Sequence, residues 1–432
     1  MKEKLVSAVR KYVPHVLQHS LEQGYRCVRA FAVNVRYGFP ARKLNIIGVT
    51  GTNGKTTTSV FINEVLKAAG KKTALFTTAI IELNGEEQPN ELNRTVPLTK
   101  ELFGFFKSAK KAKVDWVVME VTSHALDQHK FDFVPFEVAV ITNLTQDHLD
   151  YHGTMEKYAE AKARILKKNP KFAVLNRDDE WYDFFAARAK KSFTQSFGTD
   201  DRSVLDMQEL HSDLGGSRFA LVGHPVDDKT YRVDIHTHLL GQFNAYNAAA
   251  AVAVGRALAL PDEDIQKGVE AVTLVPGRME VIESPKNFTT IVDYAHAADA
   301  LRSVLTTLRS LGVNDISLVF GATGDRDKAK RPIMGRVAAE NADHIYLTDD
   351  EPYTEDPAAI RAEVLKGISK AGGDKKTVEV ADRREAIQTA IKNAKANSVV
   401  LITGMGHEKF RIVGTEHQPW DERAIVRAEL KN

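Results

Sequence analysis

The sequence has a single cysteine, no long apolar run and no excess of charge of either sign. Cys27 alone cannot form an internal disulfide bond, which favours a reducing compartment. No apolar stretch approaches the roughly 18 residues of a membrane span, and the N-terminus lacks the apolar core of a signal peptide. With 59 basic and 57 acidic residues, no bulk charge points to nucleic acid or a membrane. We therefore expect a cytoplasmic monomer with small-molecule substrates, no nucleic-acid partner and no transmembrane segment.

The 432 residues are enough for two or three domains, and the patterning divides them into three parts. Residues 1–43 precede a first alternation of short β-rich runs with helix-length stretches, which ends near Pro276. A second alternation follows Pro276-Gly277 and continues to the end. This pattern predicts an α/β protein with a doubly wound central domain at 44–277 and a Rossmann-like domain at 278–432. Residues 217–223 and 231–240 read instead as antiparallel strands.

The first 43 residues are strongly basic. They hold nine Lys and Arg but only two acidic residues, and apolar residues recur at helical spacing, at Val6, Val9, Val13, Val16 and Leu17. The pattern predicts a basic helical extension packed on the central domain. A surface for an acidic lipid or a nucleotide-linked substrate is the alternative.

The stretch IIGVTGTNGKTTT, residues 46–58, combines an apolar run, a glycine turn and the start of a helix. Glycines let backbone N–H groups approach phosphate oxygens, and the helix dipole favours the anion. Lys55 would reach the β- and γ-phosphates, and the hydroxyl of Thr56 would bind Mg²⁺. The general P-loop pattern requires glycine where Val49 stands, but the shorter form TGTNGKTT is intact. The sequence therefore predicts an ATP-binding loop.

Carboxylates and histidines follow two later strands. Glu120 ends an apolar run, which is the usual place for a Mg²⁺ partner beside a P-loop strand. Asp147 and His148 lie between the next strand and a helix. No cysteine ligand or H-E-x-x-H spacing supports zinc, so we expect His148 to join an oxygen-rich Mg²⁺ site. Lys162 reads from its own surroundings as an ordinary helix lysine.

The second alternation offers cations and anions at its strand ends. Arg326 and three further basic residues follow one strand, and fixed guanidinium groups suit carboxylate or phosphate recognition. Asp349, Asp350 and Glu408 follow two later strands and could hold an ammonium group. This half therefore looks like a site for a zwitterionic amino acid.

Nine separated motifs resemble, in order and spacing, those of the Mur ligases, in particular the synthetases that add the third amino acid of the peptidoglycan stem peptide. The motifs are TGTNGKTT, MEVTSHALDQH, TNLTQDHLDYHGTMEKYAEAK, GQFNAYNAAAA, PGRMEV, DYAHAADAL, FGATGDRDKAKRP, TDDEPYTEDP and TGMGHEKF. The resemblance covers about residues 44–425. It implies an ATP-dependent ligase that phosphorylates a terminal carboxylate and lets an incoming amine attack the acyl phosphate.

The resemblance also implies roles for individual residues. Lys55, Glu120, His148 and Lys162 would be catalytic. Two Mg²⁺ ions would be held with the help of Thr56, Glu120, His148 and a carbamylated Lys162. ATP would contact Gly51, Thr52, Asn53, Gly54, Lys55, Thr56, Thr57, Asn244, Asn247, Arg278, Asp293 and His296. The muramoyl peptide would contact Thr95, Thr122, Gln128 and Lys130. The incoming amino acid would contact Arg326, Asp350, Glu351, Tyr353, Gly404 and Glu408, with Arg326 on its α-carboxylate.

Three departures from the family pattern bear on the substrates. Ahead of the P-loop stands only the basic segment 1–43, where the family has a uridine-binding domain. Diaminopimelate-adding members carry Asp-Asn-Pro-Arg where this chain has Asp350-Glu351-Pro352-Tyr353, which disfavours diaminopimelate and favours a cationic side chain such as that of lysine or ornithine. Val96 and Lys130 replace a threonine and an arginine of the muramoyl site. The alternatives are a ligase for a γ-glutamyl or lipid-linked carboxylate and a non-catalytic nucleotide-binding subunit.

Overall fold

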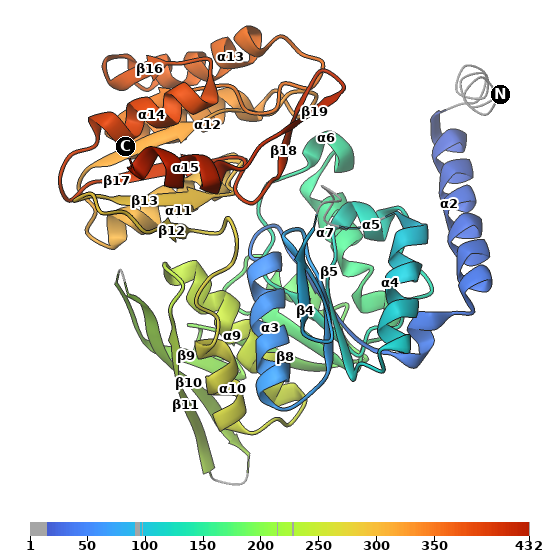
Figure 1. The fold of residues 1–432 in the computed structure, drawn as a ribbon. Coiled ribbons are helices and arrows are strands. Elements are labelled where there is room, and N and C mark those ends of the chain that lie inside the picture. The colour runs from blue at the N-terminus through green and yellow to red at the C-terminus, as the bar shows by residue number, and fades with distance from the viewer. Residues whose placement is uncertain (1–14, 91–95, 97, 214, 227–228, 432) are drawn as a thin grey trace.

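Two α/β sheets follow one another along the chain in the computed structural model, which describes residues 15–90, 96, 98–213, 215–226 and 229–431 (Figure 1). All strands of the first sheet lie before residue 238, and all strands of the second lie after residue 279. The predicted α/β fold class is confirmed. The second sheet and its helices, orange and red in Figure 1, lie over one end of the first half.

The first sheet has eleven strands in the order β11-β10-β9-β8-β7-β6-β1-β5-β2-β3-β4. The strands are β1 (Asn45–Thr50), β2 (Thr73–Phe76), β3 (Ile80–Leu83), β4 (Glu86–Pro89), β5 (Trp116–Glu120), β6 (Val138–Ile141), β7 (Phe172–Asn176), β8 (Phe193–Gly198), β9 (Leu205–Asp213), β10 (Gly216–Val226) and β11 (Lys229–Thr237). From β9 to β2 the neighbours are parallel, while β3, β4, β10 and β11 pair antiparallel. The predicted antiparallel strands at 217–223 and 231–240 correspond to β10 and β11.

Helices cover both faces of this sheet. One face packs on α3 (Lys55–Ala68), α9 (Gln242–Ala257) and α10 (Asp262–Glu270), which bury an almost continuous alanine and valine surface. The other packs on α4 (Thr99–Lys111), α5 (Ser123–Asp127), α7 (Met155–Ala163) and α8 (Tyr182–Ala186), where phenylalanines dominate. Three one-turn segments are α6 (Leu149–His152), η1 (Pro40–Lys43) and η2 (Leu166–Lys168). Because central parallel strands are buried on both faces, they read as continuous apolar runs.

The second sheet has the order β12-β13-β17-β14-β15-β16, and only β12 is antiparallel to its neighbour. Its strands are β12 (Glu280–Ile282), β13 (Thr289–Asp293), β14 (Ile316–Phe320), β15 (His344–Leu347), β16 (Thr377–Glu379) and β17 (Val399–Thr403). One face packs on α11 (Ala298–Ser310), α12 (Lys330–Asn341) and α13 (Pro357–Lys370), and the other on α14 (Arg383–Asn393) and α15 (Glu422–Lys431). The short η3 (Asp374–Lys376) and a hairpin of β18 (Phe410–Val413) and β19 (Glu416–Pro419) complete this half.

The predicted N-terminal helix is present as α2 (His15–Tyr37), which runs beside α4 (Figure 1). It buries Ala30 and Asn34 but leaves Tyr25 and Val28 about two-thirds exposed, at 66% and 67%. The apolar residues from Val6 to Val13, whose spacing predicted a helix, lie outside the described residues. Within the described part of the chain, no helix is long and apolar enough to span a bilayer.

Candidate active site

The glycine turn after β1 places the first turn of α3 at the wall of a cavity. Gly54 precedes α3 with φ of 81°, a left-handed conformation that glycine adopts without strain. A Cβ at this position would lie 2.2 Å from Oδ1 of Asn247, so a larger residue collides as well. The N-terminal N–H groups of α3 have no partner within the helix, which makes this end a ready anion site.

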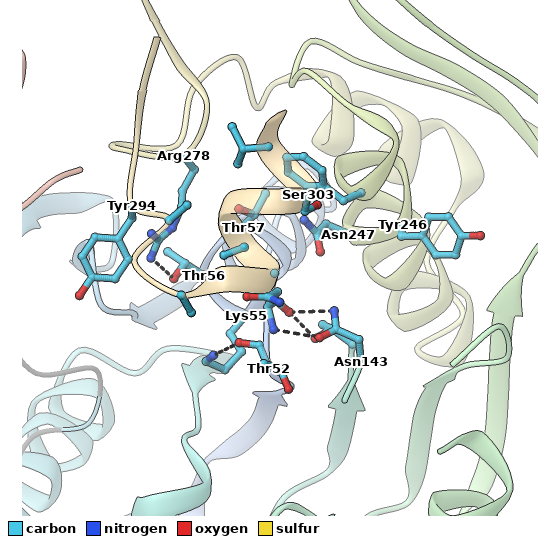
Figure 2. Close-up of a pocket in the computed structure, with 18 of the residues that line it drawn as sticks. Thr52, Lys55, Thr56, Thr57, Asn143, Tyr246, Asn247, Arg278, Tyr294 and Ser303 are labelled. Carbon is cyan, nitrogen blue, oxygen red and sulfur yellow. Dashed lines mark hydrogen bonds between the residues drawn. The ribbon is translucent and has the colours of Figure 1, made fainter. Parts of the chain in front are cut away.

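Lys55 is folded back onto the loop that precedes it. Its Nζ donates to the carbonyl oxygen of Thr52 at 2.8 Å (Figure 2). It also donates to the carbonyl oxygen of Gly51 at 3.2 Å. Burial lowers the pKa of Lys55, while the charges of Glu120 and Asp147 oppose the shift. The lysine is therefore held beside the loop by two carbonyls that a phosphate group can replace.

Glu120, at the end of β5, collects hydrogen bonds on a single oxygen. Its Oε2 accepts from Oγ1 of Thr56 and from both N and Oγ1 of Thr78, all at 2.9 Å. Among the described residues Oε1 accepts none, and the side chain is only 2% exposed. A buried carboxylate with one fixed and one open oxygen fits a divalent cation with oxygen ligands.

Arg278 brings the second half of the chain to this group. Its Nη2 donates to Oγ1 of Thr56 at 3.2 Å (Figure 2), and its guanidinium lies 4.4 Å from the ring centre of Tyr294. The hydroxyl of Thr56 therefore receives one hydrogen bond from Arg278 and gives one to Glu120. A cation from one half and an anion from the other meet on the same threonine.

The loop after β6 holds the glycine turn in place by hydrogen bonds. The side chain of Asn143 accepts from the backbone N of Asn53 at 2.9 Å and donates to the carbonyl of Asn53 at 3.1 Å (Figure 2). The hydroxyl of Thr142 donates a second bond to that carbonyl, at 2.6 Å. The turn is thus held in one shape before any ligand binds.

A cavity of about 640 Å³ extends from the glycine turn between the two halves. Its polar end is formed by residues 52–57, Glu120, Asp147 and His148. Its other end has the aromatic side chains of Phe197, Phe243 and Tyr246 and the residues of α11 between Ala300 and Thr307. The size falls within the range of small-molecule sites, and a charged end next to an aromatic end suits a nucleoside triphosphate.

The residues predicted to close over ATP occupy two positions relative to this cavity. Asn247, Arg278, Asp293 and His296 line it. Asn244 lies behind Asn247, because its Oδ1 accepts from Nδ2 of Asn247 at 2.9 Å and its own amide donates to the carbonyl of Leu240. Asn244 therefore positions Asn247 and is not itself part of the cavity wall.

Asp293 and His296 are tied to their own loop. Asp293 accepts from the backbone N–H of Met279 and of Ala295, both at 2.7 Å. Nδ1 of His296 lies 2.9 Å from the carbonyl of Tyr294, and burial lowers its pKa to about 4. A neutral imidazole with Nδ1 bound to a carbonyl leaves Nε2 as a hydrogen-bond acceptor.

Lys162 lies beneath the glycine turn. Its Nζ donates to the carbonyl of Gly51 at 2.6 Å and lies 4.5 Å from the ring centre of Tyr158. Burial, followed by the nearby charge of Lys55, lowers the pKa of Lys162 well below that of a free lysine. Lys162 is buried, and no described carboxylate forms an ion pair with it, so it is not an ordinary helix lysine. This corrects the interpretation of the residue from its sequence surroundings.

His148 stands at the cavity wall with a left-handed φ of 53°, an uncommon conformation for a residue with a side chain. Nε2 of His148 lies 3.4 Å from Oδ2 of Asp147, and its ring packs edge-on against His124. Desolvation lowers the pKa of His148 to about 3 despite the attraction of Asp147. The imidazole is therefore neutral, which is the form that binds metal ions.

Three of the four residues predicted to contact the muramoyl peptide lie at the two ends of α5. Thr122 lines the cavity and caps α5 by accepting from the backbone N of Ala125 at 3.2 Å. Gln128 and Lys130 follow the other end of α5 and do not line the cavity. Thr95 lies outside the described residues.

The six residues predicted for the incoming amino acid gather beyond the cavity, at the strand ends of the second sheet. Nη2 of Arg326 is 3.4 Å from the hydroxyl of Tyr353. A Cβ at Gly404 would lie 2.6 Å from Oδ2 of Asp350, so the backbone passes directly over that carboxylate. Glu351 accepts from the backbone N of Ile412 at 3.0 Å, and Glu408 accepts from the hydroxyl of Tyr294 at 3.1 Å.

The carboxylates of this group affect one another. Burial raises the pKa of Glu351 to about 7, and the charges of Asp350 and Glu408 add to the shift. Burial likewise raises the pKa of Glu408 to about 7, with a further contribution from Asp350. A bound cation would relieve this cost, since opposite charge favours the ionised form.

Two residues of this region were not found from sequence. Thr78 holds Glu120 with two hydrogen bonds, and its carbonyl lies 3.2 Å from Nε2 of His407 in the second half. Thr78 follows β2, and His407 follows β17. Glycine or polar residues also follow strands at several other places in this chain. That position is a sequence signal that could have pointed to both, and His407 also lies within the motif TGMGHEKF.

Two family models match the chain: the Mur ligase middle domain over residues 49–255 and the Mur ligase, glutamate ligase domain over residues 277–406. A relative from Geobacillus kaustophilus, a UDP-N-acetylmuramoyl-L-alanyl-D-glutamate–2,6-diaminopimelate ligase, is 39% identical over 414 residues, which are 94% of this chain and 83% of the relative. A protein of the same name from Bacillus cereus is 39% identical over 402 residues, 91% of this chain and 79% of the relative.

Solved structures agree with these matches. A diaminopimelate ligase of the same name has a TM-score of 0.61 at 34% identity, over 90% of this chain and 78% of that one. The folylpolyglutamate synthase of Mycobacterium tuberculosis has a TM-score of 0.71 at 21% identity, over 88% and 92%, which shows a shared fold alone. On these matches and the site geometry, the chain belongs to the Mur ligase family and is an ATP-dependent, ADP-forming ligase.

Proposed function

We propose that this ligase joins an amino acid to the terminal carboxylate of a UDP-N-acetylmuramoyl-dipeptide-type precursor, through an acyl phosphate, in peptidoglycan synthesis in the cytoplasm. The observation that carries the proposal is the Thr56 hydroxyl, held between Glu120 and Arg278 at the wall of the cavity. This arrangement supports the proposal, because the glycine turn, a buried carboxylate and a cation from the other half surround one position that would suit a phosphate group. Charge on a transferring phosphoryl group is stabilised by such groups.

The residues present fit Mg²⁺. Thr56, the open oxygen of Glu120 and the neutral His148 face one end of the cavity, with Asp147 beside them. Mg²⁺ would neutralise phosphate charge there. Asn143 and Thr142 keep the glycine turn in place, and Lys55 leaves its two loop carbonyls to bind phosphate oxygens.

We assign to Lys162 a carbamate, which would help to hold a second Mg²⁺. A neutral amine attacks CO₂, forming an N–C bond and releasing a proton, so a strongly lowered pKa favours this reaction. The carbamate is an anion, whose charge would be opposite to that of the nearby Lys55. Incubation with ¹³C-bicarbonate should give a carbamate ¹³C signal in the wild type and none in Lys162→Arg. The same signal in both proteins, or in neither, would contradict the assignment.

For the incoming amino acid, we propose one with a cationic side chain, such as lysine or ornithine. The relatives are named for diaminopimelate, but this chain has Glu351 and Tyr353 in the acceptor motif. The charge of Asp350 raises the pKa of both Glu351 and Glu408, and the charge of Glu408 raises that of Glu351, so a second ammonium group would stabilise their ionised forms. Arg326 remains available for the α-carboxylate.

The test is phosphate release with Mg²⁺, ATP and UDP-N-acetylmuramoyl-L-Ala-D-Glu, with single amino acids supplied in turn. We expect release with lysine or ornithine, together with a product heavier by that residue. Absence of phosphate release with every amino acid, while ATP still binds, would reject the muramoyl dipeptide as the carboxylate substrate. Release with diaminopimelate alone would reject the acceptor assignment but keep the ligase reaction.

A double variant tests the assignment of the incoming amino acid. Glu351→Asn combined with Tyr353→Arg restores the Asp-Asn-Pro-Arg pattern, and we expect it to gain activity with diaminopimelate. Tyr353→Phe is the matched control, because it removes the hydroxyl beside Arg326 without adding charge. No gain in diaminopimelate use by the double variant would contradict this explanation.

A further inference from the structure

Two imidazoles and a carboxylate that do not line the nucleotide cavity converge on the antiparallel edge of the first sheet. His236 lies on β11, His238 follows two residues later, and Glu270 is the last residue of α10. Residues two apart on a strand share a face, so both rings stand on the same side. The ring centres are 4.6 Å apart, and Nδ1 of His236 lies 3.0 Å from Oε1 of Glu270.

The three side chains present donor atoms within 4.8 Å of one another. They are accessible to a solute: the side chain of His236 is 29% exposed and that of Glu270 56%. Among the residues that the structure describes, the only ion pair of Glu270 is with His236, so no lysine or arginine occupies the position between them. Glu270 also ends a helix, where carbonyl groups add negative potential that favours a cation.

We propose that His236, His238 and Glu270 form a binding site for a divalent transition-metal ion of the Zn²⁺ class, separate from the magnesium site. Two neutral imidazoles and one carboxylate are a ligand set for zinc, with water in the fourth position, whereas Mg²⁺ and Ca²⁺ prefer oxygen ligands. Zinc–nitrogen and zinc–oxygen bonds of about 2.0–2.2 Å require only small side-chain rotations from the present separations.

A second group, Cys27, His129 and Asp132, has similar spacing but a different charge state. The carboxylate of Asp132 already pairs with Nζ of Lys168 at 3.2 Å and with His129 at 2.5 Å. An ammonium group thus occupies the place of a metal ion. This contrast makes the Cys27 group the control for the proposal.

The metal would connect two elements that lead to the nucleotide site. From His238 the chain continues through two buried leucines into α9, whose first turns carry Phe243, Tyr246 and Asn247 of the cavity wall. On the other side, α10 lies directly on α3, since a Cβ at Gly268 would be 2.3 Å from Cα of Val65. A metal ion therefore fastens α10 to the strand that feeds α9, and stiffens the support of the cavity.

The experiment is titration of the chelator-treated full chain with Zn²⁺, in excess Mg²⁺ and a non-hydrolysable ATP analogue that keeps the magnesium site filled. We expect one Zn²⁺ per chain and a rise in Tm on binding. His238→Ala should weaken binding at least tenfold and abolish the rise in Tm, and Glu270→Gln should weaken binding as well. Cys27→Ala should bind as the wild type does. Because His238 is exposed, its replacement leaves the fold intact.

Cobalt identifies the ligands directly. Co²⁺ at the proposed site should give visible bands without the near-ultraviolet band of a cobalt–thiolate bond. Since Cys27 is the chain's only cysteine, any such band must come from it. Absence of Zn²⁺ binding, unchanged affinity in His238→Ala, or a thiolate band that Cys27→Ala removes would each overturn the proposal.

Discussion

The hydroxyl of Thr56 receives a hydrogen bond from Arg278 and donates one to Glu120, two residues that lie on opposite sides of the junction between the halves. Such charge-assisted bonds are stronger than neutral ones. Removal of a single member of this group would leave the hydroxyl of Thr56 without one of its two hydrogen-bond partners. Substitution of individual side chains around this hydroxyl should therefore have large and specific effects on turnover and on ATP binding.

Lys55 is the first of these side chains to test. Lys55→Met removes the buried ammonium group that would stabilise charge on phosphoryl oxygens, and we expect turnover to fall about 10²–10³-fold. Phosphate release at saturating substrates measures the effect. Lys71→Met, at an exposed position just beyond α3, is the control and should retain wild-type turnover. Equal losses in both variants would show that general destabilisation, not the phosphate contact, is responsible.

The raised pKa values of Glu351 and Glu408 predict a pH dependence of acceptor binding. Both side chains have pKa values near 7 in the folded protein, so they are mainly protonated at pH 6 and ionised at pH 8. An incoming ammonium group needs the ionised form. For a carboxyl group with a pKa near 7, the ionised fraction rises about tenfold from pH 6 to pH 8. We therefore expect the KM for the amino acid to fall about tenfold over this range.

The Glu408→Gln variant should show a higher KM and a weaker dependence on pH. For stability the sign is opposite: a carboxyl pKa raised on folding means that the native state binds more protons, so this contribution to stability falls between about pH 4.5 and 7. A KM that rises with pH in the wild type would contradict the assignment of these residues to the ammonium group.

At the scale of elements, the start of α3 depends on its contact with α9. Gly54→Ala introduces a Cβ into the side chain of Asn247 and strains a left-handed residue. We expect it to weaken binding of an ATP analogue at least tenfold by calorimetry. Gly70→Ala is the matched control, because Gly70 also has a positive φ, 72°, but no atom within 4 Å of the added carbon. It should cost about 1 kcal/mol of stability at most and leave binding unchanged.

Much of the element level could be predicted from sequence because it depends on local patterns. The strands β1, β5, β6 and β7 read as apolar runs, and the glycine turn with Lys55 and Thr56 was expected where it occurs. The short β12 and the β18–β19 hairpin were not, because strands of three or four residues are too short to show a period. The position of Asn244 behind Asn247 also could not be predicted, since helix spacing gives a residue's face but not its neighbours.

At the scale of the whole molecule, side chains at the junction couple the two halves. Arg278 reaches Thr56, and His407 reaches the carbonyl of Thr78 across 329 positions of sequence. Contacts of such separation have no local signature, which is why the sequence indicated a site in each half but not the way the two join. The domain boundaries near residues 43 and 277 stay predictions.

Arg278 provides the test of this coupling. In Arg278→Ala the cavity loses a cation and Thr56 loses a donor, and we expect an ATP analogue to bind about tenfold more weakly, since charge-assisted hydrogen bonds contribute about 1.5–3 kcal/mol. Calorimetry measures the change, and Arg302→Ala, an exposed arginine of α11, serves as the control. Binding that is equal in the wild type and Arg278→Ala would mean that the second half does not contribute to the nucleotide site through this residue.

The walls of the cavity are drawn from residue 52 to residue 307, and this spread matters during synthesis on the ribosome. The glycine turn emerges early, whereas Arg278 and the α11 wall are translated more than two hundred residues later. A growing or prematurely terminated chain that stops before them carries the phosphate loop but not the groups that complete the site. Such an unfinished copy therefore cannot form the complete cavity.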